Sequence, residues 1–169
     1  MGLAPAIASA AGSEPGAPDA VLDDAFGQLF AREWAPMVRI AVGIVGDPGV
    51  AEDVVQDAFA GVYRRIGRLD RPEAYLRRSV VNGCLKALRG RRRTVVGPVP
   101  DVAGAAPAAA RELLDAVAGL SPRRRAVVVL RYYGDWSEAD IATALGVRPG
   151  TVKSTLHAAL SDLREVVER

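Results

Sequence analysis

The sequence is poor in the residues that build disulfides and metal sites. Cys84 is its single cysteine and His157 its single histidine. An internal disulfide is therefore excluded, which fits a reducing compartment. One cysteine and one histidine cannot assemble a zinc site, which takes about four protein ligands. We expect neither a metal ion nor a cofactor, and we expect Cys84 to be a small buried apolar residue.

Signals for export and membrane insertion are also missing. No lysine or arginine precedes Arg32, whereas a secretory signal peptide begins with a basic segment. No apolar run reaches the ~20 residues that a membrane-spanning helix needs. The sequence therefore predicts a soluble, cytoplasmic protein that does not insert into a membrane.

Strand-like alternation is scarce, and helical spacing takes its place. Residues 1–22 are mostly small residues and proline, so we expect a disordered tail. Residues 23–93 contain turn signals at 46–49 and 68–72, and apolar residues recur between these turns at three- and four-residue steps. This pattern predicts a first domain of three helices.

A second helical domain is expected toward the C-terminus. Residues 94–110 lack a helical period and are rich in alanine, glycine and proline, as in a linker. Helical signals resume over residues 111–169. The β-branched run at 127–130 would also suit a strand, but its helical neighbours favour a helix. The predicted fold is all-α, with two small helical domains joined by a flexible linker.

The segment 136–163 has the pattern of a helix-turn-helix. Ser137 can cap a first helix, with Asp140 reaching back in a capping-box arrangement. Gly146 suits the left-handed residue that ends such a helix, and Pro149 suits the first turn of the next one. DNA-binding proteins use this arrangement to place the second helix in the major groove.

That second helix has an apolar stripe formed by Val152, Leu156, Leu160 and Leu163. The polar residues off this stripe, which would face DNA, are Arg148, Thr151, Lys153, Ser154 and His157. An ordinary helical hairpin also needs an apolar stripe and a glycine turn. The capped start and the small polar face favour DNA binding over that alternative.

Charge is unevenly distributed along the chain, although the net charge is only +2. Residues 1–63 contain two basic and nine acidic side chains, residues 64–93 eleven and two, and residues 94–169 nine of each. The basic middle segment indicates a nucleic-acid partner. A solvated basic helix face is the alternative.

Three segments together resemble a known family: AEDVVQDAFAGVYRRI, PEAYLRRSVVNGCLKALRGRRR, and the stretch from LLDAVAGLSPRRRAVVVL to the end of the helix-turn-helix. The first two are similar to regions 2.2 and 2.3–2.4 of sigma factors, and the third to region 4. Residues 23–93 and 111–165 thus resemble the extracytoplasmic-function group of bacterial sigma-70-type RNA polymerase sigma factors. The excess of arginine over lysine, with much alanine, looks most like actinobacterial members.

The resemblance implies a sigma factor, not an enzyme, that binds core RNA polymerase and directs promoter-specific initiation. The polymerase contacts would be a coiled coil of the β′ subunit and the β flap, and an anti-sigma factor is a further candidate partner. The implied docking residues are Asp53, Gln56, Asp57, Phe59 and Tyr63. Acidic side chains on one helix face suit a basic partner, with a solvated acidic face as the alternative.

The resemblance also implies two promoter contacts. The residues implied for the −10 element are Arg71, Arg77, Arg78, Asn82, Lys86, Arg89, Arg91, Arg92 and Arg93. The preceding loop, 68–72, lies where the family builds a pocket for an unstacked base, and Tyr75 is the nearest aromatic residue. The helix after Pro149 would read the −35 element.

Three residues depart from the family pattern. Thr155 and Ala158 stand where arginine is frequent, so weaker or altered −35 recognition is expected. Trp136 stands where an aliphatic residue is usual, and we expect it to pack against the core.

Other classes of function need features that the sequence lacks. An autonomous LuxR-type regulator, acting without polymerase docking, would need an alternating β/α receiver, and residues 22–93 show no strand pattern. A hydrolase acting on nucleic acid would need clustered carboxylates or a nucleophile with its base, and Asp53 with Asp57 is too small a set. A protein that binds polymerase without reading DNA is a third alternative.

Overall fold

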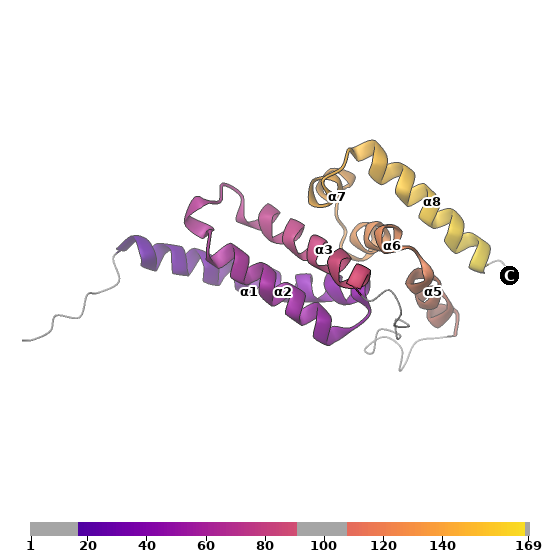
Figure 1. Cartoon of the computed structure of the whole chain (residues 1–169), viewed down its shortest axis with the longest axis horizontal. Coiled ribbons are helices and arrows are strands. Elements are labelled where there is room, and N and C mark those ends of the chain that lie inside the picture. Colours follow the sequence, from indigo (N-terminus) through magenta and orange to yellow (C-terminus); the bar gives the residue numbers. More distant parts are fainter. Residues whose placement is uncertain (1–16, 91–107, 168–169) are drawn as a thin grey trace, which may run out of the picture.

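The computed structural model describes residues 17–90 and 108–167, and these residues form seven α-helices and no strand (Figure 1). The all-α prediction is confirmed. The N-terminal domain comprises α1 (Ala17–Val45), α2 (Pro48–Tyr63) and α3 (Pro72–Gly90). The C-terminal domain comprises α5 (Ala108–Gly119), α6 (Pro122–Val128), α7 (Glu138–Leu145) and α8 (Pro149–Val167).

Two predicted boundaries were wrong by a few residues. Helix α1 begins at Ala17, so residues 17–22 are helical and not part of a disordered tail. Helix α5 begins at Ala108, within the predicted linker. Alanine has the highest helix propensity, and in both places it extends a helix that packing already stabilises further along the chain. The remainder of the predicted tail and linker lies outside the described residues.

The turn between α1 and α2 follows the sequence signals. Gly46 adopts a left-handed φ of 74° after the last residue of α1. Asp47 then caps α2 by accepting a hydrogen bond from the Val50 backbone N–H at 3.0 Å, and Pro48 occupies the first turn. A left-handed glycine commonly ends a helix, and an aspartate cap followed by proline commonly begins one. They reverse the chain so that α2 packs against α1.

Helix α3 packs on α1 and α2 through a continuous apolar face. The fully buried residues of this face are Leu76, Val80, Val81 and Cys84. Gly83 allows α2 to approach closely, because a Cβ atom at Gly83 would lie only 2.7 Å from Cγ1 of Val54. The opposite face of α3 is left for polar side chains.

Cys84 should be chemically inert in the folded protein. Burial raises the pKa of its thiol to about 12, so the thiolate that attacks labelling reagents is scarce at pH 8. We expect a thiol-specific reagent to modify native protein at least about 100-fold more slowly than urea-unfolded protein. Rapid labelling of the native protein would show that Cys84 is accessible.

The β-branched run at 127–130 is helical, as the sequence predicted. It begins in α6 and continues into a π-helical turn, η2 (Val129–Tyr133), in which the Gly134 N–H donates to the Val129 carbonyl at 2.9 Å. Ser121 stands at the N-cap position of α6, and Pro122 occupies its first turn. The Ser121 side chain, however, forms no capping hydrogen bond.

The two domains pack against each other and share one hydrophobic core. Figure 1 shows α3 beside α6 and α7, and α1 also contacts η2. We call this contact, of α1 and α3 with α6, η2 and α7, the interdomain interface. At one end of it, Nη1 of Arg125 donates to the Ile44 carbonyl at 3.2 Å. No pattern in the sequence predicted this packing of the two domains.

Candidate functional site

The helix-turn-helix is built by local hydrogen bonds at both ends of α7. The Ser137 hydroxyl accepts from the Asp140 N–H at 3.1 Å, and Asp140 Oδ2 accepts from the Ser137 N–H at 3.3 Å and from its hydroxyl at 2.6 Å. The bond from the Ser137 hydroxyl lowers the pKa of Asp140. At the other end, Gly146 has a φ of 64° and the Val147 N–H donates to the Ala142 carbonyl. The predicted capping box and left-handed glycine are both confirmed.

Helix α8 has the predicted division between an apolar and a polar face. Val152, Leu156 and Leu163 are buried and Leu160 is half-buried. Ala159 is buried on the same side, and the sequence analysis missed it because alanine fits either face. All five residues predicted to face the −35 element are exposed: Arg148, Thr151, Lys153, Ser154 and His157.

Two hydroxyls on α8 bond back to the helix. Ser154 and Thr155 both donate to the Thr151 carbonyl, at 3.1 and 2.7 Å. Their oxygens still have lone pairs that can accept from a DNA base or a protein donor. Thr155 and Ala158 are half-buried, so they offer less surface to DNA than Lys153 or His157.

Helix α2 exposes part of the predicted docking surface. Asp53, Gln56 and Asp57 are exposed along one face of the helix, and Tyr63 is exposed near its end. The prediction for Phe59 as a direct contact was wrong, because the residue is only 3% exposed. Helical spacing placed Phe59 near this face, but α1 covers its ring.

An aromatic cluster lies between α1 and α2, and the sequence analysis did not identify it. Its members are Phe26, Phe30, Trp34, Phe59 and Tyr63, with neighbouring ring centroids 4.9–6.2 Å apart. The four-residue spacing of Phe26, Phe30 and Trp34 was the available signal. Phe30 and Tyr63 remain 40% and 54% exposed. The cluster therefore adds aromatic surface to the acidic face of α2.

The polar face of α3 presents most of the residues predicted for the −10 element. Arg78, Asn82, Lys86 and Arg89 are exposed on α3, and Arg71 is exposed just before it. Arg77 differs, because it is half-buried with its guanidinium carbon 5.0 Å from the ring centre of Trp136. Arg77 thus faces the C-terminal domain in this structure. The remaining candidates, 91–93, lie outside the described residues.

Tyr75 lies against α2 near the predicted base pocket. It is half-buried, and the Arg65 guanidinium lies 5.8 Å from its ring centre. A Cβ atom at Gly61 would lie 3.5 Å from the Tyr75 hydroxyl oxygen. Tyr75 therefore packs on α2, with one side held by Arg65.

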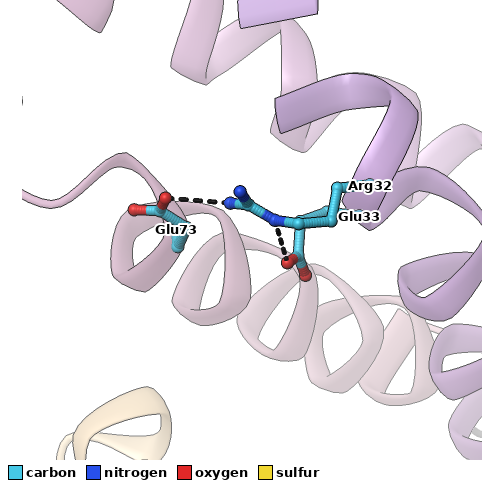
Figure 2. Close-up of polar contacts among 3 residues, drawn as sticks. All are labelled: Arg32, Glu33 and Glu73. Atoms are coloured by element: carbon cyan, nitrogen blue, oxygen red, sulfur yellow. Dashed lines mark hydrogen bonds and ion pairs between the residues drawn. The ribbon is translucent and has the colours of Figure 1, made fainter. Parts of the chain in front are cut away.

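A polar cluster connects α1 to the start of α3 (Figure 2). Arg32 donates to Glu33 at 3.1 Å and to Glu73 at 2.9 Å. Hydrogen bonds from its own backbone and from Arg32 lower the pKa of Glu73. Because Arg32 and Glu73 are largely exposed, this cluster orients the first turn of α3 more than it stabilises the fold.

The surface formed by the described residues is hollowed in several places, of which the following are examples. One, of about 780 Å³, opens between α5, α6 and α8, with Ala116 and Val166 among its apolar lining residues. Another, of about 360 Å³, lies at the interdomain interface and is lined by Glu33, Arg77 and Trp136 among others. The described residues contain no group of three acidic, histidine or cysteine side chains that could hold a metal ion. No helix among them is long and apolar enough to cross a membrane.

Comparison with known proteins identifies both domains. Residues 29–94 match the model of sigma-70 region 2, and residues 110–163 match that of sigma-70 region 4. The chain is 39% identical to the RNA polymerase sigma-E factor of Streptomyces antibioticus over 153 residues, covering 85% of this chain and 84% of the relative. It is also 39% identical to the ECF RNA polymerase sigma factor SigL of Mycobacterium tuberculosis over 150 residues, covering 80% and 85%.

Solved structures show the same fold. The sigma factor RpoE in complex with the anti-sigma factor NepR, from Bartonella quintana, superposes with a TM-score of 0.72 at 20% identity, covering 86% of this chain and 98% of that one. CnrH in complex with the cytosolic domain of CnrY gives a TM-score of 0.66 at 25% identity, covering 86% and 89%. With two sigma-70 regions in order and relatives this similar over most of its length, the chain belongs to the extracytoplasmic-function sigma factors of the sigma-70 family.

Proposed function

We propose that this sigma factor docks on core RNA polymerase through α2 and binds promoter DNA through α3 and α8. The observation that carries the proposal is an exposed acidic face on α2 and an exposed basic face on α3, two helices that pack against each other. Sigma factors are transcription initiation factors, so the partners of the two faces are polymerase and promoter. In this assignment the protein acts in the cytoplasm, where core polymerase and the chromosome are.

The docking face combines charge with aromatic surface. Asp53, Gln56 and Asp57 are spaced so that all three side chains project from one side of α2. Phe30 and Tyr63 provide exposed rings at its border. Charged residues raise the specificity of an interface and its rate of association, and aromatic residues supply much of its affinity. This combination suits a basic helical partner such as the β′ coiled coil.

The −10 face of α3 forms one continuous stripe. Arg78, Asn82, Lys86 and Arg89 follow each other at three- and four-residue steps, so they line one side of the helix over about 16 Å. Arginine and lysine bind phosphates, whereas an asparagine amide can bond to a base edge. The stripe can therefore hold the backbone of a strand while Asn82 contacts a base.

The −35 face lies at the N-terminal end of α8, which is the end that enters the groove in helix-turn-helix proteins. Lys153 and Arg148 supply the basic charge there, and Thr151, Ser154 and His157 supply further polar groups. So few cations give little non-specific affinity for DNA. We expect this helix to bind the −35 element firmly only when polymerase holds the sigma factor on the promoter.

An anti-sigma factor is also proposed as a partner. The structure of RpoE contains the anti-sigma factor NepR, and that of CnrH contains the cytosolic domain of CnrY. An autonomous LuxR-type regulator has no support in the structure, since residues 17–90 contain three α-helices and no strand of a receiver domain.

In vitro transcription with core polymerase on genomic promoter fragments tests the −35 assignment. The Lys153→Ala/Ser154→Ala/His157→Ala variant should lose at least about tenfold in transcription from −35-dependent promoters, because phosphate and base contacts disappear together. Arg164→Ala is the matched control, since it removes an exposed cation from the far end of the same helix. Unchanged promoter selection by the triple variant would refute the assignment. Tight specific DNA binding without polymerase would favour the autonomous regulator.

A further inference from the structure

We propose that the contact between Trp136 and Arg77 is a latch that holds the two domains closed until they separate to bind both promoter elements. The need to separate rests on the proposed function. The latch itself rests only on contacts in the interdomain interface.

The dimensions of the promoter require the opening. The −10 and −35 elements lie roughly 25 base pairs apart, which is about 85 Å along B-DNA at ~3.4 Å per pair. In this structure α3 packs on α7, and α7 packs on α8 (Figure 1). Helices in contact lie about 8–10 Å apart, so the two DNA-binding helices are separated by little more than two such distances. The closed arrangement cannot span both elements.

The backbone before α7 directs Trp136 into the interface. The π-helical turn η2 ends at Tyr133, and after Gly134 comes Asp135, which has a left-handed φ of 53°. The Trp136 N–H then donates back to the Leu130 carbonyl at 3.0 Å. π-Helical turns and left-handed non-glycine residues are uncommon and cluster at functional positions. Together they place the Trp136 ring against α3, where only 5% of the residue is exposed.

Arg77 is the partner that this ring meets. Its guanidinium lies over the indole ring, and tryptophan is the most favourable ring for a cation–π contact. The next residue, Arg78, approaches the turn of the helix-turn-helix, since a Cβ atom at Gly146 would lie 4.0 Å from its Nη2. The positive charge of Arg77 also contributes to lowering the pKa of Asp140 in α7. The C-terminal domain thus covers one end of the basic face that the −10 element would use.

Two hydrogen-bond donors buried in the interdomain interface lack a partner, which lowers the free-energy cost of separating the domains. Within the described residues, the buried side-chain nitrogens and oxygens without a hydrogen-bond partner are Nε of Arg77 and Nε of Arg125. Both arginines lie at this interface, Arg77 through Trp136 and Arg125 through the Ile44 carbonyl. An unsatisfied buried donor regains a water partner when the interface opens. The shared apolar core and the Arg77–Trp136 contact therefore favour the closed state, and the two unsatisfied donors oppose it.

Gly43 provides an independent means of opening the interface. A Cβ atom at Gly43 of α1 would lie 2.9 Å from Cγ1 of Val129 in η2, closer than side chains tolerate. The side chain introduced by Gly43→Leu should therefore push α1 and η2 apart. Gly27 is the matched control on the same helix, because nothing lies within 4 Å of a Cβ atom there.

The opening can be measured as a distance between spin labels on the full-length protein. Glu52→Cys on α2 and Glu165→Cys on α8 are exposed labelling sites, and buried Cys84 stays unlabelled. We expect Trp136→Leu to raise the ratio of open to closed molecules about tenfold. Arg77→Gln should give a similar rise, and the double variant should give no more than either single change, because both remove one contact. Arg89→Gln, with the same charge change outside the interface, should leave the ratio unchanged.

Two further comparisons make the test decisive. Gly43→Leu should open the protein whereas Gly27→Leu should not, and helical content by circular dichroism confirms that each variant is folded. Core polymerase with a promoter fragment should shift the wild-type protein to the open distance. Trp136→Leu and Arg77→Gln variants that stay as closed as the wild type would overturn the latch. Variants that open, in a protein that does not initiate transcription with core polymerase, would refute the proposed function and leave the latch standing.

Discussion

Replacing Asp53 and Asp57 by lysine should weaken binding of the sigma factor to core RNA polymerase by at least about 100-fold. Close opposite charges across an interface couple strongly, and the reversal converts two attractions into repulsions. Both residues are exposed on α2, so the helix should keep its structure. Titration of labelled sigma factor with core polymerase measures the dissociation constant, and circular dichroism monitors the fold.

The control variant makes the same change in charge at an exposed site away from α2. Glu165→Lys on α8 makes the same change as Asp57→Lys at another exposed site. If only the general charge of the protein matters, the two single variants weaken binding equally. If α2 is the docking helix, Asp57→Lys has the larger effect by at least about tenfold. Unchanged binding of the Asp53→Lys/Asp57→Lys variant would show that the acidic face of α2 is merely solvated.

The second large effect is expected from Ile141→Ala in the helix-turn-helix. Ile141 is fully buried in α7, and removing three carbon atoms from a packed core leaves a cavity. We expect the free energy of unfolding to fall by about 3–4 kcal/mol. Ile141→Val, which removes one methylene, should lose about 1 kcal/mol. Urea denaturation followed by circular dichroism measures both values.

The same denaturation series reports on the interdomain interface. Because the two domains share one hydrophobic core, the wild-type protein should unfold in a single transition. Ile141→Ala should lower the midpoint of that transition. A cost below about 1 kcal/mol for Ile141→Ala would mean that the site relaxes around the smaller side chain and that Ile141 is not tightly packed.

Much of the C-terminal site could be predicted because its signals are local. The Ser137 and Asp140 capping box, the left-handed Gly146 and the helix start at Pro149 each depend on residues within a few positions of one another. Local hydrogen bonds and backbone preferences act the same way in any surroundings. For this reason the exposed face of α8 was also predicted correctly.

The docking face was predicted less completely because it depends on a second helix. Periodicity placed Phe59 close to the acidic residues of α2, but the position of α1 decides which rings are covered. Phe26, Phe30 and Trp34 approach from α1, so Phe59 is buried beneath them and Phe30 becomes part of the surface. Helical spacing specifies a direction for each side chain, not the neighbour that it meets.

Sequence alone determined the helices, the helix-turn-helix and the family, because each depends on short-range spacing and residue type. The tertiary structure decided how the domains lie against each other. Arg77 and Arg78 are adjacent in the sequence and chemically identical, yet one stacks on Trp136 while the other is exposed. That difference comes from the contact of α3 with α7. Contacts between residues far apart in the chain leave no periodic pattern in the sequence, so only the folded structure shows them.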